Sequence, residues 1–168
     1  MKLGKLNKNN KGFTLLETIV AVGLIAVGLV AALALITTSL FYVSNIQDRL
    51  AAANLMAEGI ETVRNIRDNN WLQNKVWNNG LANGDYQVSY DYNYSALPFP
   101  FYNDNNPLLL NSNGFYNYVS GATTPYKRKV SITNLPNGYE MQVISTVTWI
   151  RRGIAYSSSA EDHLFNWK

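Results

Sequence analysis

The sequence predicts an α+β protein in which one long N-terminal helix packs on a small antiparallel sheet. Three observations lead to this fold class. Residues 19–36 form an uninterrupted apolar run, residues 45–68 place apolar side chains at helical spacing, and later segments alternate apolar and polar residues as β-strands do. No proline occurs before Pro98, so one helix can include the first two segments. We therefore expect a single spine helix on a sheet of three or four strands.

The composition is divided between an apolar N-terminal block and a polar remainder. Of the 168 residues, 47% are hydrophobic and only 15% are charged, against a usual charged share of about 25%. The formal net charge is +3, and four lysines lie in the first eleven residues: Lys2, Lys5, Lys8 and Lys11. There is no cysteine and a single histidine. This excludes a disulfide scaffold or a thiol nucleophile and leaves little material for a histidine metal site, so no cofactor is predicted.

The apolar block is long enough to cross a membrane. Thr18–Val43 exceeds the roughly 20 residues that a helix needs to span the hydrocarbon core. The lysines before it predict a cytoplasmic N-terminus and an extracytoplasmic remainder. A secretory signal peptide cleaved after Ala32-Leu33-Ala34 and a plain signal anchor are alternatives. Neither accounts for Glu17, a carboxylate at the edge of the apolar segment, which calls for a partner.

Residues 11–17, Lys-Gly-Phe-Thr-Leu-Leu-Glu, resemble the processing signal of type IV prepilins and pseudopilins. The resemblance implies cleavage by prepilin peptidase between Gly12 and Phe13, and N-methylation of Phe13. It also implies that Glu17 serves assembly by pairing with the new amino terminus of a neighbouring subunit. The implied partners are prepilin peptidase, other pilin or pseudopilin subunits, an inner-membrane assembly platform, and membrane lipid before assembly.

The helix is predicted to continue beyond the membrane segment as an amphipathic half. Its apolar face consists of Ile46, Leu50, Ala53, Met56, Ile60, Val63 and Ile66. Arg64 is expected to pair with Glu61 and with Asp68. The helix is predicted to run from about Phe13 to Arg67, with residues 68–70 as its terminator. The expected organisation is a leader at 1–12, a transmembrane or filament-core helix at 13–44, and a pilin-like head at 45–168 whose amphipathic helix half covers 45–68.

A finer resemblance concerns residues 53–61, Ala-Asn-Leu-Met-Ala-Glu-Gly-Ile-Glu, with Val63-Arg64 and Asn70-Trp71 after them. This segment is similar to minor pilins of the pilus-modification type, and to type II secretion pseudopilins. The apolar helix lacks the proline, and the C-terminal region lacks the cysteine pair, found in many major pilins. The resemblance therefore implies a minor pilin or pseudopilin.

Four segments of the remainder predict strands. Residues 85–94 place five alternating apolar residues on one face: Tyr86, Val88, Tyr90, Tyr92 and Tyr94. Residues 126–133 and 139–150 form a hairpin through the turn at 134–138, and a last strand begins at Ile154. Val143, Val147 and Trp149 could face the helix, although Ile144 and Ile150 leave the register open. Residues 95–125 are predicted to be a long loop outside the sheet, either an ordered insertion that covers it or a binding surface.

Three groups of polar residues are candidates for binding chemistry. Asn103–Asn106 could offer oxygen ligands to calcium, but the stretch has few carboxylates and a solvated turn is expected instead. Residues 161–163, Glu-Asp-His, are expected to be a polar strand edge rather than a metal or catalytic site. Residues 127–129 and 151–152 are basic and could bind DNA, although basic residues on strands also prevent edge aggregation.

The predicted function is that of a structural subunit, with no enzymatic activity. A minor pilin or pseudopilin would assemble into, or prime, a type IV pilus-like filament. It would begin as a single-pass protein of the cytoplasmic membrane and end in a periplasmic or extracellular filament. The alternatives are a filament-borne subunit that binds DNA or surfaces and a signal-anchored extracytoplasmic protein.

Overall fold

The computed structural model describes residues 12–91 and 98–167. The chain forms two compact units, Met1–Ile46 and Gln47–Lys168. We call Gln47–Lys168 the head. The basic leader residues 1–11 and two tyrosines of the predicted first strand, Tyr92 and Tyr94, lie outside the described residues.

One helix, α1, spans Leu15–Leu72 and continues from the first unit into the head. It begins after Thr14, whose side-chain oxygen accepts a hydrogen bond from the Glu17 amide at 3.2 Å. The expected terminator at residues 68–70 was wrong, because the helix runs to Leu72. The Asn70 side chain is buried and donates to the carbonyls of Trp77 and Asn79, at 3.0 Å each. Asn70 thus holds the following turn against the helix instead of ending it.

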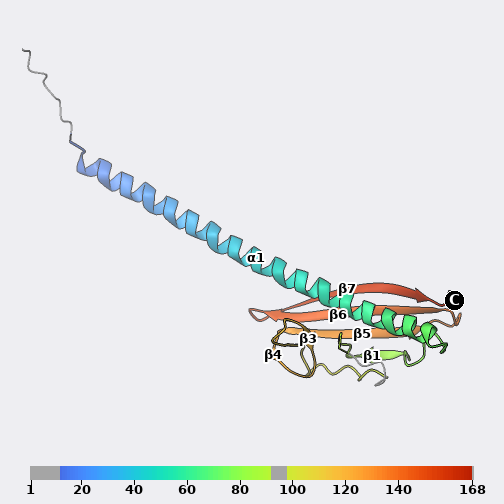
Figure 1. Cartoon of the computed structure of the whole chain (residues 1–168). Coiled ribbons are helices and arrows are strands. Elements are labelled where there is room, and N and C mark those ends of the chain that lie inside the picture. Colours follow the sequence, from blue (N-terminus) through green and yellow to red (C-terminus); the bar gives the residue numbers. More distant parts are fainter. Residues whose placement is uncertain (1–11, 92–97, 168) are drawn as a thin grey trace, which may run out of the picture. The chain divides into compact units, whose positions relative to one another are not determined.

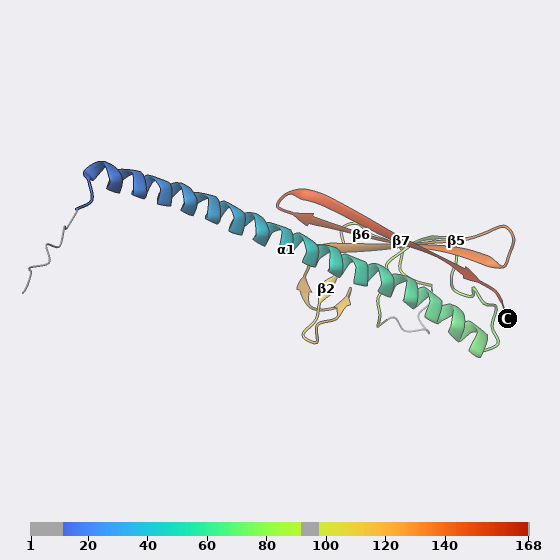
Figure 2. The ribbon, with the colours of Figure 1, turned by 90° about the horizontal axis from the view of Figure 1, so that it is seen from above.

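The main sheet has four antiparallel strands in the order β1-β5-β6-β7, as Figure 1 shows. The strands are β1 Gly84–Tyr86, β5 Tyr126–Asn134, β6 Glu140–Arg151 and β7 Ile154–Phe165. The C-terminal part of α1 packs along one face of this sheet (Figure 2). The α+β architecture, with its long N-terminal helix on an antiparallel sheet, is therefore confirmed.

The register of the long strands places one face of the sheet in the core. Alternate residues of β6 are buried, including Val143, Val147 and Trp149, whereas Ile144 is half-buried and Ile150 is exposed. Val143 pairs with Ile132 on β5, and Ile60, Val63 and Ile66 of α1 belong to the same core cluster. The register left open by the sequence is thereby decided, since a strand shows its two faces alternately.

Two predictions about the intervening chain were wrong. In place of the strand expected at 85–94, the described residues form only the three-residue β1. The expected alternation of buried and exposed residues is also absent, because Gln87 and Ser89 are buried as well as Tyr86 and Val88. Residues 95–125 contain a second, three-stranded sheet of order β3-β2-β4. Its short strands are β2 Leu109–Leu110, β3 Tyr116–Asn117 and β4 Ala122–Thr123. Each of these strands is only two residues long, which is too short for an alternation of apolar and polar residues to be recognised in the sequence.

The buried face of α1 is rotated from the predicted one at its start. Leu50 and Ala53 are exposed, while Ala52, Leu55 and Gly59 are buried. Gly59 lies against the sheet so closely that a Cβ atom there would stand 2.7 Å from the Ser145 hydroxyl. The close approach of helix and sheet, which requires a residue without a side chain, selects this face over the more apolar one.

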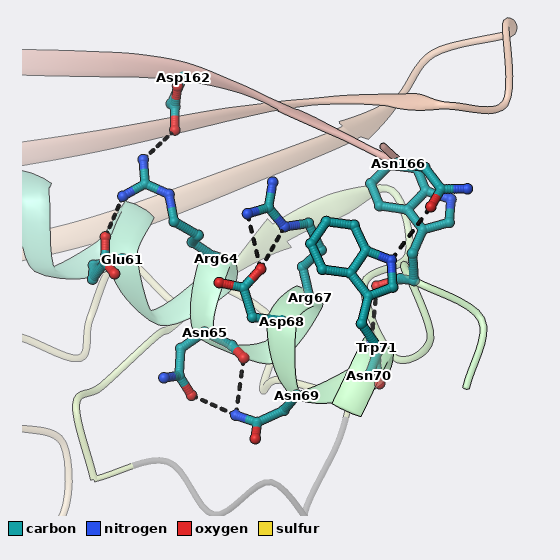
Figure 3. Close-up of polar contacts among 11 residues, drawn as sticks. Glu61, Arg64, Asn65, Arg67, Asp68, Asn69, Asn70, Trp71, Asp162 and Asn166 are labelled. Atoms are coloured by element: carbon teal, nitrogen blue, oxygen red, sulfur yellow. Dashed lines mark hydrogen bonds and ion pairs between the residues drawn. The ribbon is translucent and has the colours of Figure 1, made fainter. Parts of the chain in front are cut away.

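The ion pairs along α1 also differ in part from expectation. Arg64 pairs with Glu61, as predicted, but its second partner is Asp162 of β7 at 2.7 Å (Figure 3). Asp68 pairs instead with the neighbouring Arg67 at 2.9 Å. The expected pairing of Arg64 with Asp68 is therefore wrong, because a tertiary partner lies within reach of the guanidinium.

Candidate functional site

The N-terminal end of α1 brings together the residues of the predicted processing signal. Gly12, Phe13 and Thr14 precede the helix without regular secondary structure, and all three are exposed. Thr14 is the N-cap: its carbonyl accepts the first helical hydrogen bond from the Thr18 amide at 3.2 Å. The Gly12–Phe13 bond therefore lies in accessible, non-helical chain, two residues before Leu15.

Thr14 and Glu17 have the spacing of a capping box, in which a cap residue is followed three positions later by glutamate. The Thr14 half of the box is formed by the 3.2 Å contact to the Glu17 amide. The Glu17 carboxylate lies in the first turn, where the positive end of the helix dipole favours it. Among the residues that the structure describes, no ion-pair partner of Glu17 is found. Thr14 is a helix cap that was not predicted from the sequence, although the Thr-x-x-Glu pattern indicates it.

The apolar half of α1, residues 15–40, is exposed along its whole length in the isolated chain. None of its 18 most apolar consecutive residues is buried, and the helix is long and apolar enough to cross a membrane. Two of its polar side chains are satisfied within the helix, since Thr37 and Thr38 both donate to the Ala34 carbonyl, at 2.9 and 2.8 Å. A helix with satisfied backbone and hydroxyl groups can be placed in lipid without unpaired donors.

Together these features place the predicted processing signal at the start of a helix that is long and apolar enough to fit membrane anchoring. The family model of the prokaryotic N-terminal methylation motif matches residues 7–33. No curated protein and no solved structure matched the chain. The chain therefore carries a type IV pilin-like prepilin signal, that of a type IV pilin or pseudopilin precursor.

The predicted basic patch is largely neutralised in the head. Arg128 is fully buried, while Lys127 pairs with Asp104 at 3.2 Å and Lys129 with Asp85 at 3.3 Å. The Ser131 hydroxyl and the Lys129 ammonium lower the pKa of Asp85, so this pair stays ionised. The expectation of a patch on adjoining strands was wrong for Arg128, since the alternation of β5 turns the middle residue of 127–129 into the core.

The Asn103–Asn106 stretch forms a turn closed by its own side chain. The Asn103 carboxamide oxygen accepts from the Asn105 amide at 3.0 Å. Asp104, the one carboxylate, accepts from the Tyr102 hydroxyl at 2.8 Å and pairs with Lys127. The structure shows no group of metal-ligating side chains within residues 12–91 and 98–167.

His163 connects the ends of β6 and β7 through two glutamates. Its Nδ1 lies 2.6 Å from Glu140, and its Nε2 lies 3.0 Å from Glu161. These hydrogen bonds raise the pKa of His163 above its ordinary value, first through Glu140 and then through Glu161. In turn, the pKa of Glu140 is lowered by His163 and Asn137, and that of Glu161 by Gln142 and His163.

We expect this end of the sheet to be more stable in mild acid than in mild base. The raised pKa of His163 stabilises the fold below about 6.5, and this contribution is lost as pH rises through the folded-state pKa. The lowered pKa values of Glu140 and Glu161 stabilise the fold above about pH 4.5. Both contributions are therefore present between about pH 4.5 and about pH 6.5. Amide exchange at residues 140–142 and 161–163 should be slower at about pH 5.5 than at about pH 8, after correction for intrinsic rates. The His163→Gln variant should lose the difference, and its persistence there would contradict this assignment.

Proposed function

We propose that the chain is a minor pilin or pseudopilin, a structural subunit that assembles into or primes a type IV pilus-like filament after processing. The methylation motif at residues 7–33, which leads directly into an exposed apolar helix, carries this proposal. An exposed apolar side chain gains about 1.5–3 kcal/mol when it is buried. The apolar half of α1 therefore requires lipid before assembly and neighbouring helices afterwards.

Processing is proposed at the Gly12–Phe13 bond, followed by N-methylation of Phe13. This cut removes residues 1–12 with all four lysines of the leader and leaves residues 13–44 as the membrane and filament-core helix. Residues 45–168, which include the head, form the extracytoplasmic part, with the leader on the cytoplasmic side as the lysines favour. The inner-membrane assembly platform and other pilin subunits are the partners that this function requires.

Glu17 is proposed to act in assembly by pairing with the amino terminus of a neighbouring subunit. Its carboxylate lies in the first helical turn, four residues after Phe13, and has no partner among the described residues of the single chain. An unpaired carboxylate in a membrane segment is unfavourable by a few kcal/mol. The new positive charge at Phe13 of another chain would remove that penalty.

Co-expression of the precursor with a prepilin peptidase tests the proposal directly. We expect a product whose intact mass and N-terminal residue correspond to methylated Phe13. Gly12→Val should remain uncut. A Cβ at Gly12 meets no atom within 4 Å, so the chain itself tolerates the substitution and the loss reports recognition by the enzyme.

Gly23→Val is the matched control, because a Cβ at Gly23 also meets no atom within 4 Å. It should be processed like the natural sequence. An uncut natural chain would instead support a signal anchor, and a cut after Ala34 would support a secreted protein. Either result would remove the basis of the filament function.

The alternative of a DNA- or surface-binding subunit receives little support from the head. Lys127, Lys129 and Arg151 already have carboxylate partners, which reduces the charge available to phosphates. The described part of the 95–125 region also packs against the head, since Leu108 is buried and the Tyr118 hydroxyl donates to the Arg128 carbonyl at 3.0 Å. These contacts favour an ordered insertion over a free binding loop.

A further inference from the structure

The proposed scissile bond lies close to a sharp helix boundary. Gly12 and Phe13 are non-helical and exposed, with the Phe13 side chain 80% accessible, and α1 begins only two residues later at Leu15. The boundary coincides with Thr14, whose hydroxyl oxygen accepts from the Glu17 amide at 3.2 Å. The processing motif at residues 7–33 covers the same segment and independently marks it as a substrate of an enzyme.

The position of this boundary matters for the chemistry of cleavage. Inside an α-helix, each carbonyl oxygen accepts a hydrogen bond from the amide four residues later. If α1 began earlier, the Gly12 carbonyl would be bonded to the Leu16 amide and shielded within the helix. A peptidase that must reach this carbonyl would then find only the non-helical fraction of its substrate competent.

Little else in the local sequence stops the helix from extending toward the leader. Leu15 and Leu16 are good helix formers, and Gly12, of a type that caps helices about as well as threonine, is the next capping residue upstream. Gly12 is not held in a left-handed conformation, so its backbone does not oblige a break there. The hydroxyl of Thr14 is thus the group that fixes the helix start.

We propose that Thr14 is a positioning residue for processing: by capping α1, it keeps the Gly12–Phe13 bond out of the helix and available to the peptidase. This inference rests on the proposed cleavage site. Thr14 acts through the conformation of the substrate, without contacting the reacting atoms. Its removal should therefore lower the fraction of competent substrate and leave the chemical step unchanged.

Cleavage kinetics of the full precursor, with purified prepilin peptidase in detergent micelles, provide the test. Thr14→Ala removes the cap and introduces the best helix former, so KM should rise about threefold to tenfold while kcat stays unchanged. Thr14→Ser retains the cap and should restore the natural KM. Thr18→Ala is the matched control, because it also loses a hydroxyl hydrogen bond, to Leu15 at 2.8 Å, but leaves the helix start in place.

The backbone carbon chemical shifts of Gly12 and Phe13 in the same micelles complete the experiment. Those of Phe13 should become helical in Thr14→Ala, with Gly12 as the new cap, and those of both residues should remain non-helical in the other chains. A natural KM for Thr14→Ala, a raised KM for Thr14→Ser, or a raised KM without helical shifts would each overturn the inference. A natural precursor that is uncut, or cut at another bond, would instead refute the proposed cleavage site and is distinguishable by mass.

Discussion

Replacing Arg128 by methionine is expected to destabilise the head by about 3 kcal/mol, because the guanidinium is buried and donates to acceptors that are themselves buried or half-buried. Arg128 is fully buried and comes from β5. It donates to the Leu55 carbonyl of α1 and to Glu58, at 2.9 Å each, and also to the Val88 carbonyl. One side chain thereby fastens the helix, the sheet and the chain after β1 to one another.

Chemical denaturation of the processed chain in detergent would measure this loss. Trp77 and Trp149 are both buried in the head, so their fluorescence reports its unfolding. Lys129→Met is the matched control on the same strand. Its pair with Asp85 is about half exposed on the carboxylate side and should contribute about 0–1 kcal/mol. Equal losses for the two variants would contradict the role given to Arg128.

The partial exposure of Glu58 indicates how much of the expected loss at Arg128 comes from this carboxylate. Its side chain is 30% exposed, so the carboxylate can regain water when Arg128 is removed, which limits the penalty of leaving it unpaired. The Val88 carbonyl has no such recourse if it stays buried, whereas the Leu55 carbonyl keeps its place in the hydrogen-bond ladder of α1. The double variant Glu58→Gln/Arg128→Met should therefore recover only a minor part of the stability that Arg128→Met loses.

The second large effect is expected at Asp48, where Asp48→Ala should destabilise the head by about 2 kcal/mol. Asp48 is buried on α1 and accepts a hydrogen bond from the Tyr126 hydroxyl at 3.0 Å. Arg151, at the end of β6, contacts the same carboxylate at 3.0 Å. Burial, and then the hydrogen bond to Asp48, raise the pKa of Tyr126, so the tyrosine remains a donor at neutral pH.

The size of this effect depends on how well the partners of Asp48 can regain water. The Arg151 side chain is 37% exposed, so its charge can be hydrated after the loss, and most of the penalty falls on Tyr126 and the vacated space. Asp48→Asn keeps an oxygen acceptor and should lose less than Asp48→Ala. Asp68→Ala, which removes an exposed carboxylate of the same helix, should change the unfolding free energy by less than about 1 kcal/mol. A loss at Asp68 as large as that at Asp48 would show that charge on the helix, rather than the buried contact, is responsible.

The wrong prediction for the basic triplet has a physical cause. The basic triplet 127–129 was interpreted as a surface patch because charged residues are rarely buried, yet strand alternation directs Arg128 inward, where three acceptors await it. One of these partners, the Leu55 carbonyl, lies more than seventy residues away in the sequence. No local sequence pattern predicts such a contact.

The sequence by itself determined the processing signal, the apolar helix and the strands β5 and β6, because each depends on local features. A basic leader, a contiguous motif, helix periodicity and a hairpin turn are all read within a few residues of one another. Tertiary structure alone decided which helix face meets the sheet, since the close approach at Gly59 and the ion pairs of Asp48 and Arg128 outweigh a more apolar stripe through Leu50 and Ala53. It also decided the second sheet and the pairing of the basic side chains, because these depend on groups that only the folded chain brings together.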